Sequence, residues 1–338
     1  MAHEIKANDV FGEVRAHGQR AWHGLGVELP TGMGAWDAFS QIGLGWGTEL
    51  LPVYSTLPDG NQIEIDTHRA HVRSDNHELL GIVGEGYRPI ANRTLAEFAD
   101  ALVGSDNQVE TETAGSLRNG KVVFSLVRLP RNIEVTDEDI LNQYVLIRNS
   151  HDGSAAFSCY PTSIRVVCAN TLRFSERDSS RGIRFQHTGD IESKIEQARL
   201  VLGLVTEETA KFESLVRVLA AKHLRSDEVR EYFKSVYDMS FGAVSLDADP
   251  DNKVIARRIA RRDQILDTWS ENMENDRQSL DGIRGTAWAA YNAVSEWHDH
   301  ERGRFGAVTE SDGRAHSNLF GVSDAHKRIA FSTALQLV

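Results

Sequence analysis

The spacing of hydrophobic residues changes once along the chain, near residue 190. Before that point, apolar and polar residues alternate over short stretches, which is typical of strands with one buried face. After it, apolar residues recur every three to four positions, as they do on one face of an amphipathic helix. The pattern predicts an α+β chain. A mainly antiparallel, hairpin-rich sheet domain with an N-terminal arm spans 1–189, and a helical bundle or cap spans 190–338, packed on the sheet or extending from it.

Short strands and two helices are expected before the centre of the sheet. The expected strands cover 49–56, 62–66, 68–73 and 79–83, and a hairpin joins 108–117 to 121–129. Asn119-Gly120 at its tip favours a tight turn. Residues 33–42 have helical spacing. A second helix over 95–103 begins after Thr94, because Thr94 and Glu97 have the spacing of a capping box.

The centre of the predicted sheet lies between Gln143 and Phe174. Apolar and β-branched residues predict strands at 144–147, 155–160 and 164–168. Asp152-Gly153 favours a hairpin turn between the first two strands. Pro161 is expected to end the second strand, because proline has no backbone N–H to donate to a sheet.

Arginine, asparagine and aromatic residues are concentrated in and after this central stretch. Arg165 lies within an apolar run, so it either meets water or a carboxylate, or joins its neighbours in binding phosphate or carboxylate. Arg20 and His23 flank Trp22, which either anchors an N-terminal arm or brings both to the same ligand. The candidate nucleic-acid-binding residues are Arg148, Asn149, Tyr160, Arg165, Asn170, Arg173, Phe174, Arg181 and Arg184, together with Arg20 and His23.

The charge distribution supports a local anion site in an acidic protein. The formal net charge is −12, which does not favour nucleic-acid binding by the protein as a whole. Residues 141–189, however, hold six arginines against three acids, a net of +3. An acidic segment at 131–140 is expected to be a solvated loop. If residues 175–189 move, their arginines could close over a polyanion.

Cysteine content and hydropathy indicate a cytoplasmic protein. Cys159 and Cys168 match no zinc pattern and are too few for a disulfide framework, so they fit a reducing compartment. The N-terminus lacks the features of a signal peptide. No apolar run approaches the roughly 18 residues that a membrane-spanning helix needs, so no membrane partner is expected.

The helical region contributes two charged features. Helices are expected over 191–220, 229–237, 254–269, 285–298 and 325–337. Arg257, Arg258, Arg261 and Arg262 share one broad face of the third. His298 and His300 point apart on a helix, so they are not expected to hold one metal ion.

No motif indicates a catalytic residue or a cofactor. The chain has no P-loop and no G-x-S-x-G, and Gly84-Glu85-Gly86 precedes a proline rather than opening a dinucleotide-binding helix. Glu64, Asp66 and Asp75 offer scattered carboxylates for a metal-dependent nuclease. We therefore expect no cofactor and favour a non-catalytic protein.

Four motifs resemble those of a phage- and plasmid-encoded family grouped as a domain of unknown function. They are WHGLG at 22–26, GYRPIAN at 86–92, NSHDGS…RVVCANTL at 149–172 and GTAWAAYNAVSEWHDH at 285–300. The resemblance covers nearly the whole chain. It implies a mobile genetic element and a bacterial cytoplasm, and an association with genes that handle incoming single-stranded DNA. It implies no catalytic residues.

Three functions follow as hypotheses. The first is a phage or plasmid protein that binds single-stranded DNA and anneals or protects it, since a sheet followed by helices is similar in outline to single-strand annealing recombinases. Such a protein is expected to form homo-oligomers. The second is an acidic protein that binds and inhibits or redirects a host protein. The third is a metal-dependent nuclease.

Overall fold

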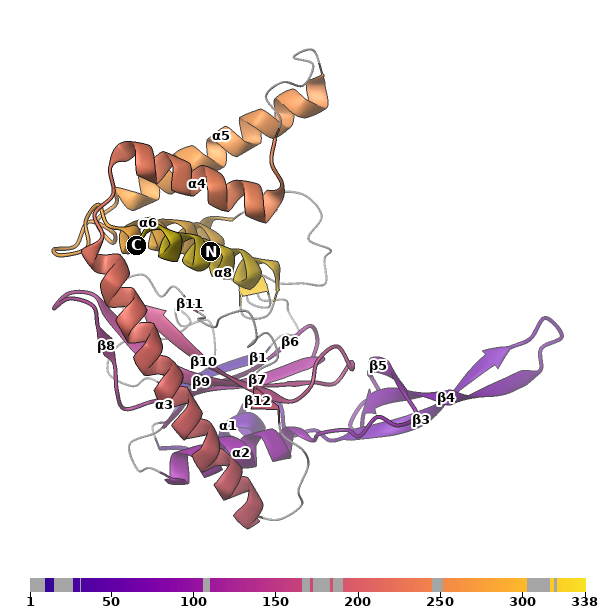
Figure 1. Cartoon of the computed structure of the whole chain (residues 1–338). Coiled ribbons are helices and arrows are strands. Elements are labelled where there is room, and N and C mark those ends of the chain that lie inside the picture. The colour runs from indigo at the N-terminus through magenta and orange to yellow at the C-terminus, as the bar shows by residue number, and fades with distance from the viewer. Residues whose placement is uncertain are drawn as a thin grey trace.

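A computed structural model describes most of the chain. The described residues are 10–14, 27–30, 32–105, 110–165, 171–172, 183–184, 191–244, 252–302, 317–318 and 321–338. Strands dominate the first half, and helices the second (Figure 1). The predicted α+β class is confirmed.

A nine-stranded sheet forms the centre of the molecule, in the order β11-β10-β9-β7-β6-β1-β2 with β8 beside β9 and β12 beside β10. All pairs are antiparallel except β1 with β2. The strands are β1 (Val10–Val14), β2 (Val27–Leu29), β6 (Glu110–Leu117), β7 (Val122–Arg128), β8 (Ile133–Glu134), β9 (Ile140–Ser150), β10 (Ser158–Arg165), β11 (Thr171–Leu172) and β12 (Ile183–Arg184).

The hairpin predicted at Asn119-Gly120 is confirmed, because β6 and β7 meet there. Arg118, Asn119 and Gly120 all have positive φ, at 57°, 59° and 82°. Glycine adopts that conformation without strain and asparagine tolerates it. This turn therefore fixes the register of two central strands.

The break expected at Pro161 is wrong. β10 runs through Pro161, which is opposite Val145 of β9. On its other side β10 pairs with β12 only at 158–159, and with β11 only at 163–164. Position 161 faces neither short strand, so the missing N–H removes no ladder hydrogen bond there.

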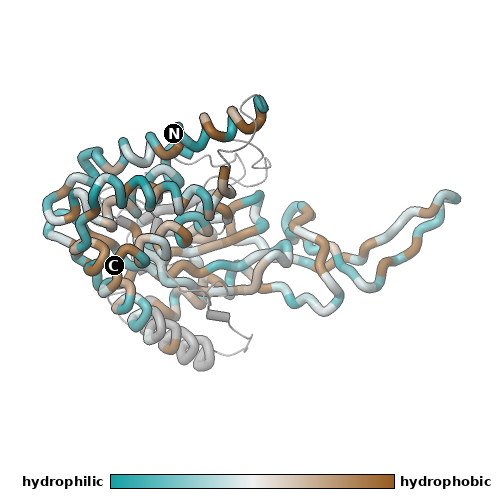
Figure 2. Tube along the Cα trace, turned by 45° about the horizontal axis from the view of Figure 1, so that its top comes forward, coloured by the Kyte–Doolittle hydropathy of each residue, from teal (hydrophilic) through white to brown (hydrophobic). Residues whose placement is uncertain are grey.

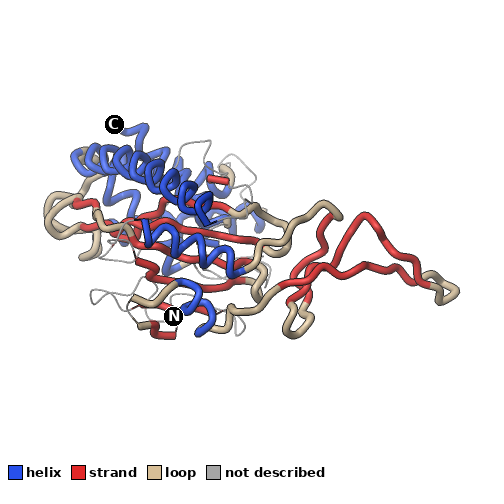
Figure 3. The backbone as a smooth tube through the Cα atoms, turned by 90° about the horizontal axis from the view of Figure 1, so that it is seen from below, coloured by secondary structure: helices blue, strands red, loops and turns tan. Residues whose placement is uncertain are grey.

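A second sheet of three strands projects from the body as an arm (Figures 1 and 3). It consists of β3 (Thr48–Thr56), β4 (Gln62–Arg73) and β5 (Leu79–Gly84). The strands predicted at 62–66 and 68–73 are one strand with an irregularity, where the register jumps between Pro52 and Val53 of β3. β5 covers only residues 68–72 of β4, so the outer part of the arm is a two-stranded ribbon.

Two helices form a core with one face of the main sheet. They are α1 (Ala35–Gln41) and α2 (Asn92–Ser105), and their buried Phe39, Leu95 and Leu102 pack with sheet residues such as Val145. Both helices were predicted, although α2 begins at Asn92 rather than after Thr94. The longest helix, α3 (Ile191–Ala221), runs from beside α2 to the helical region (Figure 1).

The remaining helices form a second core at the end of the sheet. They are α4 (Ser226–Phe241), α5 (Lys253–Met273), α6 (Ala287–Glu296), a π-helical turn η2 (Trp297–Glu301), α8 (Val322–Ala334) and η3 (Leu335–Leu337). Trp269 and Trp288 are fully buried among them. Ile133 and Leu141 of the sheet belong to the same core, so these helices pack directly on the sheet.

The acidic segment at 131–140 is only in part the solvated loop that the sequence predicts, because Glu134, Asp137 and Glu138 are exposed but Asp139 is not. Asp139 is fully buried, and its Oδ2 accepts a hydrogen bond of 2.8 Å from Nε1 of Trp288 in α6. Glu134 belongs to β8. The carboxylate of Asp139 thus joins the sheet to the helical region.

Among the described residues, no helix combines the length and the apolar composition that crossing a membrane requires.

Candidate functional site

The structure brings together two of the predicted nucleic-acid-binding residues. Arg148 of β9 lies over the ring of Tyr160 of β10, with the guanidinium carbon 6.0 Å from the ring centroid. Tyr160 is only 6% exposed. We therefore correct its predicted role, because a buried ring cannot stack on the bases of a nucleic acid.

Asn149 also has a role inside the molecule. Its Nδ2 donates a 2.9 Å hydrogen bond to the backbone oxygen of Ile90, and the residue is 1% exposed. Its predicted contact with nucleic acid is therefore wrong. Asn149 fixes the segment that leads into α2 against the central sheet.

The register of the main sheet brings a further predicted arginine near Arg148. Arg148 and Arg184 are both opposite Ser158, on its two sides, so the three backbones form one row across β9, β10 and β12. Arg165 ends β10 opposite Leu141. The other predicted residues lie outside the described residues: Arg20, His23, Asn170, Arg173, Phe174 and Arg181.

A run of basic residues lies on α5, at the outer side of the helical region (Figure 1). Its basic residues are Lys253, Arg257, Arg258, Arg261 and Arg262, and no acid lies between positions 253 and 262. The first three are exposed and the last two are partly buried. We call these five residues the basic face of α5.

The basic face concentrates positive charge at the start of a helix. Asn252 caps α5 by accepting hydrogen bonds from the backbone nitrogens of Val254 and Ile255, at 3.0 and 3.4 Å. Cations near a helix N-terminus are unfavourable, and so are like charges four residues apart. Arg262 is paired with Asp263 at 2.8 Å. An anion bound here would relieve the remaining repulsion.

The positive charge of the basic face also affects the pKa values of neighbouring groups. Burial lowers the pKa of the Arg302 guanidinium, and the charge of Arg261 lowers it further. Burial raises the pKa of Tyr237 in α4, while Arg261, Arg258 and Arg262 oppose that rise. The basic face is therefore an electrostatic feature that reaches α4 and the segment after α6.

Two of the sequence motifs meet at the root of the arm. The hydroxyl of Tyr87 donates to the backbone oxygen of Ser150 at 3.1 Å. Nε2 of His151 lies 2.8 Å from Oδ1 of Asn92. On the arm itself, Nδ1 of His71 lies 2.6 Å from the backbone oxygen of His151. The segments 86–92 and 149–154 thus form one unit that attaches the arm.

The hydrogen bonds at this root assign the imidazoles. Nδ2 of Asn92 donates to the oxygen of Leu44, so its Oδ1 accepts from Nε2–H of His151. Burial lowers the pKa of His151 to about 3, with a smaller effect from His71. Gly81 approaches the same place so closely that a Cβ there would lie 2.7 Å from Cα of Asp152. The root thus packs neutral imidazoles and backbone closely, beside the carboxylate of Asp152, which pairs with Arg118 at 3.2 Å.

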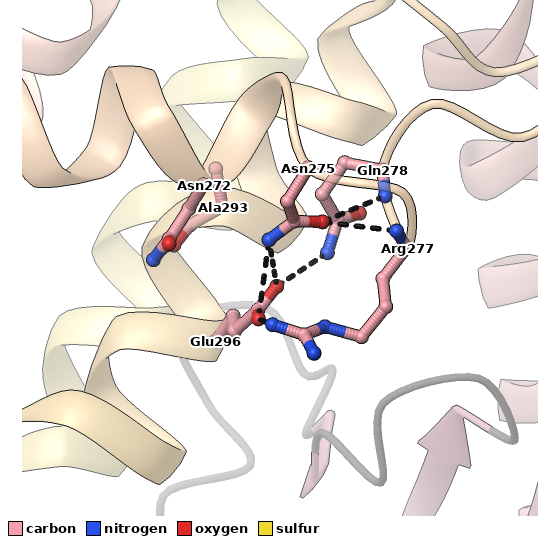
Figure 4. A network of polar contacts seen from close by, with 6 residues as sticks. All are labelled: Asn272, Asn275, Arg277, Gln278, Ala293 and Glu296. Atoms are coloured by element: carbon pink, nitrogen blue, oxygen red, sulfur yellow. Dashed lines mark hydrogen bonds and ion pairs between the residues drawn. The ribbon is translucent and has the colours of Figure 1, made fainter.

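A network of hydrogen bonds and one ion pair holds the loop between α5 and α6 (Figure 4). The carboxylate of Glu296, 1% exposed, accepts from Nδ2 of Asn275 at 3.2 Å and from Nε2 of Gln278 at 2.9 Å. It also pairs with the guanidinium of Arg277. Oδ1 of Asn275 accepts from the backbone nitrogens of Arg277 and Gln278. Glu296 therefore fixes the loop rather than facing a ligand.

The π-helical turn that follows carries buried charge. Nζ of Lys327 donates to Oδ1 of Asp299 at 2.7 Å, with side-chain exposures of 1% and 2%. Burial lowers the pKa of His298 well below its usual value, and burial with Arg302 lowers that of His326 to about 4. His300 lies nearer the surface. Within the described residues no three His, Cys, Asp or Glu side chains form a metal-binding group.

The carboxylates considered for a nuclease lie on the arm. Asp75 accepts two hydrogen bonds from Arg73, at 3.0 and 2.7 Å. Glu64 lies 3.9 Å from the guanidinium of Arg69. Asp66 lies at the exposed irregularity of β4. They do not converge on a shared ion.

Comparison with known proteins gives a family without an assigned activity. Two Escherichia coli (strain K12) proteins, UPF0380 protein YfjQ and UPF0380 protein YafZ, are each 32% identical to this chain over 95 residues. That match covers 28% of this chain and only 33% of each relative. No solved structure matches the chain. The family model described as "Domain of unknown function (DUF932)" matches residues 79–320, so the chain belongs to the DUF932 family.

Proposed function

We propose that this protein binds single-stranded DNA through the phosphate backbone, with the basic face of α5 as the main contact. The observation that supports this is the set of five cations on one helix with no acid among them. Lys253, Arg257 and Arg261 follow one another at intervals of four residues, and so do Arg258 and Arg262. Residues four apart lie on the same side of a helix, so the five cations form one stripe.

The chemistry of the stripe fits a polyanion. Guanidinium groups bind phosphate through two parallel hydrogen bonds, and each bound phosphate releases condensed counterions. The surrounding acidic protein would repel DNA elsewhere, which confines the contact to this helix. Tyr160 is buried, so the described part of the predicted aromatic set supplies no stacking. We therefore expect little dependence on base sequence.

The proposal is tested by fluorescence anisotropy with a labelled oligo(dT) at several salt concentrations. If about four phosphates are contacted, log K should fall with log salt at a slope of about −3. Arg257→Glu with Arg258→Glu should weaken binding at low salt by at least about tenfold and flatten the slope. The matched control is Arg230→Glu, an exposed arginine on α4. Equal binding by all three proteins would refute the proposal.

The other two hypotheses predict different results. An acidic protein that docks on a host protein should keep its partner after the Arg257→Glu and Arg258→Glu changes, which a pull-down from host lysate measures. A nuclease should cleave the oligonucleotide when Mg²⁺ or Mn²⁺ is added. We include no catalytic step, because Glu64 and Asp75 are engaged with arginines on the exposed arm.

A further inference from the structure

A cluster of aromatic and polar side chains lies where α4, the end of η2 and α8 meet, next to the basic face of α5. The guanidinium carbon of Arg302 lies 5.9 Å from the centroid of the Phe241 ring. The ring of His326 lies 4.6 Å from that of Phe241 and 5.2 Å from that of His298. Hydrophilic positions are interleaved with hydrophobic ones along the helices of this region in Figure 2, and both histidines are buried.

The start of α8 holds the guanidinium of Arg302 in place. Its Nη1 donates to Oγ of Ser323 at 3.0 Å, and that oxygen lies 3.0 Å from Oγ of Ser317. The backbone nitrogen of Ser323 donates to Oγ of Ser317 at 3.3 Å. Ser323 is buried, whereas Arg302 and Phe241 are partly exposed. Solvent therefore reaches the cluster at the guanidinium, and the hydroxyls lie deeper.

Positive charge exceeds negative charge among the described side chains here. Arg261, in the basic face of α5, is close enough that its charge lowers the pKa of the Arg302 guanidinium. The two buried carboxylates have cations beside them, in the pairs Asp299–Lys327 at 2.7 Å and Asp324–Arg328 at 3.4 Å. These six side chains comprise four cations and two carboxylates, a net of +2. An anionic ligand would relieve the repulsion between Arg261 and Arg302.

Two buried polar side chains of the cluster have no hydrogen-bond partner in the described part of the chain. Both ring nitrogens of His298 lack one, and this residue is 0% exposed. Both amide atoms of Asn318, which follows Ser317, also lack one, and that residue is 2% exposed. A neutral imidazole always carries one N–H, and a buried donor without an acceptor is unfavourable. These donors would be satisfied by the oxygens of a bound anion.

We propose that this cluster binds a phosphomonoester, and that this group is the terminal phosphate of the DNA strand whose backbone contacts the basic face of α5. The inference rests on the proposed function, because the strand is the same. A phosphodiester within a strand presents two unshared oxygens and one charge. A terminal phosphate presents three such oxygens and a charge of about −1.5 to −2 at pH 7. Arg302, Arg261 and the N–H of His298 provide donors for three oxygens.

Oligo(dT) strands that differ only at their ends test this assignment. Each carries an internal fluorescein and has a 5′-phosphate, a 3′-phosphate or hydroxyls alone, and fluorescence anisotropy at low salt gives its dissociation constant. One of the phosphorylated strands should bind at least about fivefold tighter than the hydroxyl strand, because charge-assisted hydrogen bonds to the terminal group are added. Equal binding by the three strands would overturn the inference and leave the proposed function intact.

The ratio of the dissociation constants is also the measurement for variants, since a general loss of backbone binding affects every strand alike. Arg302→Gln should abolish the preference for the phosphorylated strand. Arg230→Gln makes the same change at an exposed position of α4 and should preserve it. If circular dichroism shows that Arg302→Gln is unfolded, Ser323→Ala removes only a hydroxyl and should reduce the ratio. A ratio that stays unchanged in the folded variant would overturn the assignment.

Thymidine monophosphate separates the two sources of a phosphomonoester, a strand end and a free nucleotide. In excess it should remove the advantage of the phosphorylated strand, because it carries the same group. If it binds as tightly as that strand, the ligand is a free nucleotide and the assignment to a strand end is overturned. Failure of every strand to bind at low salt would refute the proposed function, and the strand-end assignment with it.

Discussion

The arm and the core around the π-helical turn distribute polar and apolar groups in opposite ways. In the helical region, Glu296, Asp299 and Lys327 are nearly inaccessible to water, and each has charged or polar partners. On the arm, Ile63 and Ile82 are about half exposed. The free energy of unfolding that a substitution removes depends on how deeply the side chain is buried. Similar substitutions in the two regions should therefore have different effects on stability. Substitutions in the core should affect folding, whereas substitutions of exposed side chains on the arm should affect folding little.

The largest effect should come from the buried ion pair. Lys327→Met removes the ammonium that lies 2.7 Å from Asp299 and leaves a carboxylate inside the core. Breaking one partner of a buried pair costs about 3–5 kcal/mol. Urea unfolding should show this loss. Combining Lys327→Met with Asp299→Leu should recover much of it, because neither charge then remains. A single variant as stable as the parent would contradict the assignment.

The buried histidines should make stability fall in acid. The pKa of His298 and of His326 is lower in the folded state than in the unfolded chain, so the unfolded chain binds more protons. Their stabilising contribution is full above about pH 6.5 and decreases below it. For His326 the decrease ends near its folded pKa of about 4.

Each histidine should contribute a slope that approaches 1.4 kcal/mol per pH unit. Urea unfolding between pH 7 and pH 5 measures the loss from these two histidines together with that from His151 and His71, because burial lowers their pKa values too. His298→Gln removes one titrating group and should reduce the slope. An unchanged slope in this variant would show that other groups cause the acid sensitivity.

A smaller effect is expected where the arm meets the turn that follows β9 of the main sheet. A Cβ at Gly81 would lie 2.7 Å from the backbone of Asp152, so Gly81→Ala must shift the arm or the 151–154 turn. Overpacking of this kind costs about 1–3 kcal/mol. Gly84→Ala is the control, because no atom lies within 4 Å of its Cβ position. Thermal melting of both variants compares them, and equal melting temperatures would mean that the joint is loose.

The sequence predicts what depends on local pattern. Alternation and turn residues predicted β6 and β7 with their turn at Gly120, and the 3.6-residue period predicted α1, α4 and α5. Pro161 was misread because the two short strands flanking β10 leave its position free, which is a non-local fact.

Candidate functional residues were harder to predict for the same reason. The sequence predicts a solvated Asp139, but its hydrogen-bond partner Trp288 lies 149 residues away. Asn149 and Tyr160 belong to a stretch rich in arginine, but their side chains are directed into the fold. The arginines of α5 could be assigned to one face from their spacing, although only the structure shows which of them are exposed.

The smallest effect on stability should come from Ile63, in strand β4 of the arm. Ile63→Asp should change the free energy of unfolding by no more than about 0.5 kcal/mol, because the side chain already meets water. Val294→Asp in α6, where the side chain is fully buried, should prevent stable folding. A loss above 2 kcal/mol for Ile63→Asp would mean that the arm unfolds together with the body. In that case the apolar residues of the arm would support the fold of the whole chain despite their exposure.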